Sequence, residues 1–188
     1  MKEMLSLTDS NSRPMSRRKR LRRVALLCSA FTTNAAYYRI GTRAEYSHLR
    51  DQNTFWRTAN SNFLDTCVLE WCKLFGDEKG QHYWGNIVAE PKTFQANLLS
   101  HLGVTEAAFK AEIQVMRQYR DKFLAHLDSE LKMQVPTLDV AMRAVWFYQA
   151  HLVSSEAKPG DLIGLDADLE GVFEILEARA TEVYLRNA

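Results

Sequence analysis

Apolar residues recur every three to four positions along nearly the whole chain, and no stretch alternates apolar and polar residues as a half-buried strand does. This periodicity predicts an all-α protein, a bundle of about five to six helices. The expected helices cover about 17–43, 53–75 and 91–103, a segment from 105 through the 117–128 stretch, a segment from 137 or 139 to about 152, and about 167–186. Asn53 and Thr105 are the residue types that cap helix starts, and Gly76 is typical of a helix end.

The chain of 188 residues is long enough to bury a sizeable core within one domain. Residues 1–16, rich in Ser and Asn and containing Pro14, predict a disordered tail, and residues 17–188 a single helical domain. The tail and the first predicted helical turns together form a basic N-terminal arm.

Charge is distributed unevenly, although the net formal charge is only +1. Residues 1–23 contain eight Lys and Arg against Glu3 and Asp9, so this stretch carries +6 and the remainder −5. A basic arm on a mildly acidic body favours contact with nucleic acid or another anionic surface. A solvated tail without a partner is the alternative interpretation.

Three cysteines, Cys28, Cys67 and Cys72, cannot all pair within one chain, and none has the spacing of a zinc ligand set. We therefore expect them to be reduced and buried in a cytoplasmic protein, with no metal and no cofactor. No apolar run approaches the roughly 20 residues of a membrane span, so no membrane partner is expected.

The helix predicted to start at Thr105 carries an arginine where an apolar residue is expected. Six side chains at helical spacing point within roughly 40° of one direction, and five of them are apolar. They are Phe109, Ile113, Met116, Arg120, Phe123 and Leu127. A guanidinium on such a seam is costly unless it is paired or faces a cleft. Six residues further on, His126 can exchange a proton near neutral pH.

An arginine and a histidine suffice for one kind of RNA cleavage. A base removes the proton of the ribose 2′-hydroxyl, an acid protonates the leaving 5′-oxygen, and a cation stabilises the phosphorane-like charge. The imidazole of His126 can serve as base or acid, and Arg120 can bind phosphate oxygens in a bidentate manner. One histidine per chain is awkward for two proton transfers, and a homodimer would supply two.

Helix geometry weakens this interpretation, because six residues along a helix give about 9 Å of rise and a turn of roughly 120°. The two side chains would converge only if the helix ends near Ala125 or if a partner chain contributes. In the alternative interpretation, Arg120 pairs with a core carboxylate such as Glu70 or Asp65, and His126 caps the helix.

The stretch Arg120-Asp-Lys-Phe-Leu-Ala-His126-Leu-Asp128 resembles the signature of the HEPN superfamily. In that signature an Arg, usually followed by Asn, Asp or His, precedes a His by four to six residues near the end of a helix. The form Arg-Asp-Lys-x-x-Ala-His-x-Asp is similar to the abortive-infection (AbiU-type) branch. The stretches Cys67–Gly76 and Gln81–Trp84 also resemble a segment of HEPN-like proteins, so the resemblance covers roughly residues 24–153.

The resemblance implies a helical bundle that dimerises with its Arg…His helices facing each other. Many such proteins are metal-independent endoribonucleases that act as toxins or phage-defence effectors, and others are inactive modules that bind a nucleotide, RNA or a protein partner such as an antitoxin. If the roles in the HEPN signature apply to this chain, Arg120 and His126 would be catalytic and Asp121 would orient them. An acidic residue on the preceding long helix would support the arginine, and Glu70 is the best candidate, followed by Asp65.

The sequence therefore predicts, on this resemblance, a metal-independent endoribonuclease of a prokaryotic toxin–antitoxin or phage-defence system. The alternatives are an inactive binding module and a plain helical interaction domain in which the Arg…His match is accidental. The cations expected to contact RNA are Arg17, Arg18, Lys19, Arg20, Arg22, Arg23, Arg117 and Lys122.

Overall fold

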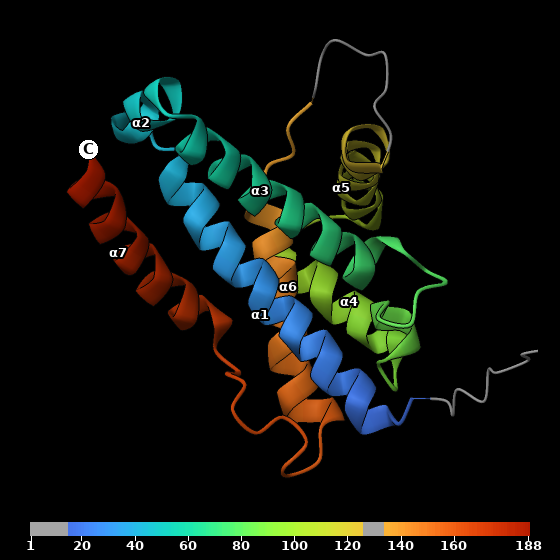
Figure 1. Ribbon diagram of the computed structural model, residues 1–188. Coiled ribbons are helices and arrows are strands. Elements are labelled where there is room, and N and C mark those ends of the chain that lie inside the picture. The colour runs from blue at the N-terminus through green and yellow to red at the C-terminus, as the bar shows by residue number, and fades with distance from the viewer. Residues whose placement is uncertain (1–14, 126–133) are drawn as a thin grey trace, which may run out of the picture.

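The computed structural model describes residues 15–125 and 134–188, and these residues are all-helical, without a strand. The long helix α1 (Arg17–Gly41) has α3 (Thr54–Trp71) along one side and α7 (Leu169–Asn187) along the other (Figure 1). The short α2 (Ser47–Gln52) precedes α3, and α4 (Pro91–Leu102), α5 (Glu106–Tyr119) and α6 (Asp139–His151) complete the bundle. The expected all-α bundle is confirmed, and the predicted tail over residues 1–14 and the end of the 117–128 stretch lie outside the described residues.

Local sequence signals set the helix ends. The Asn53 side chain accepts a hydrogen bond from Phe55 N at 2.9 Å, and Thr105 accepts one from Ala108 N at 3.2 Å, so both predicted caps are confirmed. Gly103 ends α4 in the left-handed region with φ 68°, which only glycine adopts without strain. The six residues of α2 were not predicted, because a helix of this length spans less than two turns and shows no apolar period.

The core is built largely from aromatic side chains that meet between α3, α4, α5 and α6. Trp71, Phe75, Phe94 and Tyr148 are almost fully buried, and the ring centroids of Trp71 and Phe75 are 5.2 Å apart. Helix α1 contributes Phe31 to the same core together with smaller residues, among them Ala25, Cys28 and Ala35. Small side chains allow neighbouring helices to approach α1 closely.

Among the helices that the structure describes, three widen into a π-helical turn at their carboxyl ends. These turns are η2 (Cys72–Gly76) after α3, η4 (Arg120–Ala125) after α5 and η5 (Leu152–Glu156) after α6. Short 3₁₀ turns, η1 (Ala44–Tyr46) and η3 (Trp84–Asn86), lie in the connections. A π turn changes the angular register of every residue that follows it, and such turns are frequent at functional sites.

All three cysteines are free and buried, as the sequence predicts. Burial raises the pKa of each thiol, that of Cys72 to about 12. Of the helices that the structure describes, none combines the length and the apolarity that crossing a membrane requires.

Candidate functional site

Arg120 begins the π turn η4, and its guanidinium is paired with two carboxylates from the same chain. Nη1 donates to Asp77 Oδ1 at 2.6 Å, and Nε donates to Asp121 Oδ1 at 2.8 Å. The Arg120 side chain is 19% exposed, whereas Asp77 and Asp121 are 38% and 54% exposed. The arginine is therefore held from both sides near the surface, and its contacts with described residues engage two of its five N–H donors.

The π turn η2 places Asp77 beside Arg120. Asp77 N donates to Cys72 O at 2.8 Å, and Gly80 N donates to Asp77 O at 2.6 Å, so the backbone bends sharply on both sides of the carboxylate. A Cβ added at Gly76 would lie 3.3 Å from Cγ of Arg117, which shows how closely the Arg117 stem packs on this turn. The absence of a side chain at Gly76 therefore allows α5 and the loop after α3 to lie in close contact.

A cavity of about 380 Å³ opens beside this pair. It is lined by the loop Gly76, Asp77, Glu78, Lys79 and Gly80, together with Arg117. Arg117 and Lys79 bring positive charge to the cavity wall, Asp77 and Glu78 offset it, and Asp77 links the cavity to Arg120. The guanidinium of Arg117 is the group of this wall best suited to contact a phosphate.

The carboxylates keep Arg120 charged and fixed in orientation. Its pKa is raised above its ordinary value, chiefly by the hydrogen bond to Asp121 and further by that to Asp77, against the opposing effect of partial burial. The same two carboxylates also offset the positive charge of Arg120. The two carboxylates therefore fix the orientation of the guanidinium, but the paired Arg120 attracts an anion less than an unpaired arginine would.

The structure places the other predicted site residues as follows. Asp121 contacts Arg120, as its expected orienting role requires. Glu70 instead accepts two hydrogen bonds from Lys73 Nζ, at 3.0 and 3.1 Å, and Asp65 accepts one from Tyr119 Oη at 2.8 Å. His126 lies outside the described residues. The carboxylate that sequence reasoning missed is Asp77, whose one signal is its place in a Gly-bounded loop directly after a helix.

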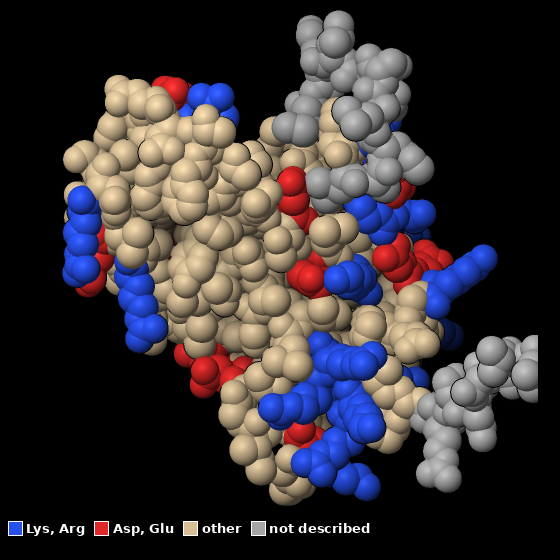
Figure 2. Space-filling view, viewed as in Figure 1, with Lys and Arg blue, Asp and Glu red and all other residues tan. Residues whose placement is uncertain are grey.

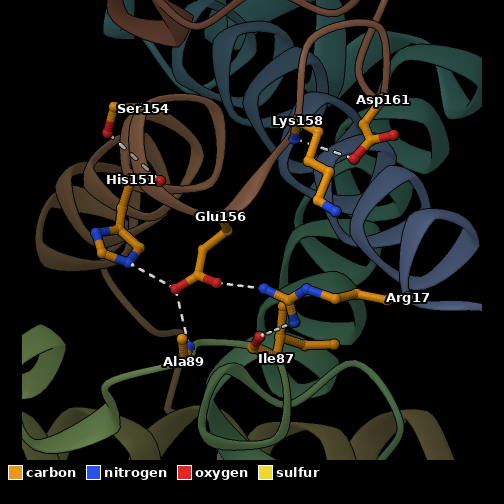
Figure 3. A network of polar contacts seen from close by, with 8 residues as sticks. All are labelled: Arg17, Ile87, Ala89, His151, Ser154, Glu156, Lys158 and Asp161. Atoms are coloured by element: carbon orange, nitrogen blue, oxygen red, sulfur yellow. Dashed lines mark hydrogen bonds and ion pairs between the residues drawn. The ribbon is translucent and has the colours of Figure 1, made fainter.

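The predicted basic arm is, from Arg17 onward, the ordered start of α1, and several of its arginines contact one distant loop. Arg17 donates to Ile87 O at 2.9 Å and pairs with Glu156 (Figure 3). Arg18 donates to Gly160 O at 3.1 Å, and Arg22 donates to Ile163 O at 2.9 Å. The first turn of α1 has no acidic residue, so these contacts offset the poor placement of cations at a helix amino terminus.

Glu156 is the centre of this anchor. Its carboxylate, only 4% exposed, accepts from Ala89 N at 2.9 Å, and His151 Nε2 lies 3.2 Å from the same oxygen. Figure 3 shows that His151, Ala89 and Arg17 approach the carboxylate from three different segments of the chain. Residue 156, at the end of η5, therefore joins the end of α6, the 87–89 segment and the start of α1.

Four exposed cations of α1 form what we call the α1 basic surface, made of Arg18, Lys19, Arg22 and Arg23. Arg18 and Arg22 also make the loop contacts described above, and Arg18 Nε lies 3.5 Å from Asp161 Oδ1. Figure 2 shows Lys and Arg side chains gathered over the start of α1, and others mixed with acidic ones beside the loop after α3. Arg20 is half-buried, with its Nε inaccessible, and does not belong to this surface. The pKa of the nearby His82 is lowered by burial and by the charges of Arg23 and Lys73, so the positive field extends to the 81–83 segment.

The remaining expected RNA contacts, Arg117 and Lys122, lie in α5 and η4, and only Arg117 lines the cavity. Within residues 15–125 and 134–188, no group of three His, Cys, Asp or Glu side chains has the arrangement to hold a metal ion. No family model, no curated protein and no solved structure matches this chain.

Proposed function

We propose that this protein is an RNA-binding, HEPN-type endoribonuclease that cleaves RNA with Arg120 and His126. The observation that carries the proposal is the fixed guanidinium of Arg120, held by Asp77 and Asp121 at the helix end that leads into the segment of His126. The α1 basic surface and Arg117 supply the positive charge that an RNA backbone requires.

In the proposed reaction the imidazole of His126 removes the proton of a ribose 2′-hydroxyl. The 2′-oxygen attacks the adjacent phosphorus, and the bond from phosphorus to the 5′-oxygen breaks. A second imidazole, from the partner subunit of a homodimer, protonates the leaving oxygen, while Arg120 stabilises the charge on the phosphoryl oxygens. The products carry a 2′,3′-cyclic phosphate and a free 5′-hydroxyl, and the chemistry uses no metal ion.

The HEPN resemblance also carries the proposed setting, which is a cytoplasmic toxin–antitoxin or phage-defence system with an antitoxin or another protein as a further partner. In that setting Asp121 and Asp77 are the orienting carboxylates. Glu70, which the resemblance favoured, has Lys73 as its contact instead.

The test is cleavage of a pool of single-stranded and structured RNA in EDTA. The parent protein is compared with Arg120→Ala, His126→Ala and a matched control, Arg186→Ala, which removes an exposed arginine on α7. We expect cleavage by the parent and the control, with cyclic phosphate ends, and none by the two site variants. Equal cleavage by all four proteins, or none by the parent, would exclude the catalytic proposal.

A second function is favoured by one observation, the neutralisation of Arg120 by two carboxylates. In that case the protein binds RNA without cleaving it, through the α1 basic surface alone. The same RNA pool then shows salt-dependent binding, no cleavage, and unchanged affinity in Arg120→Ala.

A further inference from the structure

A second hollow lies between the end of α4, one face of α6 and the start of α7, and none of its residues belongs to the Arg120 cluster or the α1 basic surface. Its volume is about 580 Å³, within the range of small-ligand sites. An adjoining hollow of about 440 Å³ shares Arg143, Trp146 and Glu170 with it. The two form one groove along α6, which we call the α6–α7 groove.

Aromatic side chains line this groove. Arg143, Trp146, Phe147 and Ala150 follow one another at helical spacing, so α6 presents them on one face. The ring centroids of Trp146 and Phe173 lie 5.3 Å apart, and the two rings meet edge to face. The small side chains of Ala150 and Ala167 leave room beside the indole.

The charges around the groove favour a cation over an anion. Five carboxylates line the two hollows, those of Asp139, Asp168, Glu170, Glu174 and Glu177, against the guanidinium groups of Arg39 and Arg143. Glu177 pairs with Arg39 at 3.5 Å, and Asp168 accepts from Gly171 N at 2.9 Å as the cap of α7. Within the described residues, Glu170 and Glu174 have no ion pair, so their charge is available to a ligand.

Two features of the groove oppose a cation, and neither outweighs these carboxylates. The amino terminus of α7 carries partial positive charge, which Asp168 and Glu170 in and before its first turn offset. Arg143 donates to Leu102 O at 3.2 Å, at the carboxyl end of α4, so its guanidinium is engaged with that helix end.

The wall of the groove already contains a cation held in this way. The guanidinium of Arg39 lies 5.7 Å from the centroid of the Phe173 ring and 3.5 Å from the Glu177 carboxylate. An aromatic face and a carboxylate together stabilise a cation more than either does alone. Trp146, the best cation-binding ring, and Glu170 repeat this combination in the open part of the groove.

We propose that the α6–α7 groove is a binding site for an organic cation, an ammonium or guanidinium group on an aliphatic chain. Trp146 provides the ring face, Glu170 and Glu174 provide the counter-charge, and the apolar lining contacts the methylene groups. The cation can be a free polyamine or an Arg or Lys side chain of a partner protein, since both present the same chemistry.

The experiment titrates the full chain in 150 mM NaCl, a condition chosen to screen loose ion contacts. One arm uses spermidine, and a second uses the blocked peptide acetyl-Gly-Arg-Gly-amide. The readout is the NMR shift of the Trp146 indole N–H, assigned with Trp146→Phe, and the Trp56 indole serves as an internal reference. Glu170→Gln is compared with Glu182→Gln, which makes the same charge change on α7 outside the groove.

We expect a saturable shift at Trp146 and not at Trp56, and a dissociation constant raised about fivefold or more in Glu170→Gln but unchanged in Glu182→Gln. Saturation by spermidine alone identifies a free polyamine as the source, and saturation by the peptide alone identifies a partner side chain. The proposal is overturned if neither probe shifts Trp146, or if both glutamine variants weaken binding equally. Thermal melting of both variants confirms that the fold is intact.

Discussion

Two arginines of this protein each meet a carboxylate from a distant segment, and the two carboxylates differ in burial. Arg17 meets Glu156, which is 4% exposed and also contacts a backbone amide and a histidine. Arg120 meets Asp77, which is 38% exposed, and the still more exposed Asp121. Removing the partner of a buried carboxylate is costly because its charge is left uncompensated away from water, whereas a pair whose carboxylate water can reach contributes about 0–1 kcal/mol. The Arg17–Glu156 pair therefore has a structural role, whereas the Arg120–Asp77 pair can exchange its contacts for those of a ligand.

The largest expected effect comes from breaking the buried pair. Glu156→Gln should lower the free energy of unfolding by about 2 kcal/mol, less than for a fully buried pair because Arg17 is half exposed. Urea denaturation followed by circular dichroism measures this loss. Asp77→Asn is the matched comparison, with an expected loss below about 1 kcal/mol. Equal losses in the two variants would remove the distinction between the pairs.

The next prediction distinguishes Asp77, which contacts Arg120, from Glu70, the carboxylate that the HEPN resemblance favours. Asp77→Asn should slow RNA cleavage about tenfold, since the amide no longer fixes the charged guanidinium, while RNA affinity is kept. Glu70→Gln, which loses only its contact with Lys73, should leave the rate unchanged. The reverse ranking of the two rates would show that Glu70, and not Asp77, supports the arginine.

A smaller effect tests the α1 basic surface, which the Glu156 anchor holds in place. Lys19→Ala combined with Arg23→Ala should weaken RNA binding and flatten its dependence on salt, by about 0.7 in the log–log slope for each phosphate group that is no longer neutralised. Fluorescence anisotropy at several salt concentrations measures both quantities. Lys110→Ala combined with Arg186→Ala removes the same charge elsewhere and serves as the control. An unchanged slope in the first variant would place the RNA on another face.

The last effect is confined to alkaline pH and concerns the buried thiol of Cys72. Burial raises the pKa of Cys72 from 9.0 to about 12, so the thiol stays protonated in the folded protein where it would ionise in the unfolded chain. Its contribution to stability is complete below pH 9 and is lost as the pH rises from 9 toward 12. The urea midpoint should fall over this range, and less so in Cys72→Ala. Identical pH profiles of the two proteins would contradict this assignment.

The helices and their caps could be predicted because they depend on neighbours in sequence. The apolar period located α1, α3 and α7 to within a few residues, and Asn53 and Thr105 marked two starts. The partners of the two arginines could not be predicted in this way. Asp77 directly follows the π turn η2, and Glu156 ends another π turn in a segment between two predicted helices. A π turn has no apolar signature, and its register shift moves a side chain to a face that helical spacing does not foresee.

The anchor of α1 also has a consequence for the order in which the chain is synthesised. The contacts of Arg17, Arg18 and Arg22 join residues separated by 139, 142 and 141 positions. The basic stretch is therefore made first, and the carboxylate and carbonyl groups that hold it are made in the last fifth of the chain. Until that last part leaves the ribosome, Arg18 and Arg22 lack these partners, and Arg17 has only its contact with Ile87 O. Completion of the carboxyl-terminal segment is thus the step that fixes the basic start of α1 in place.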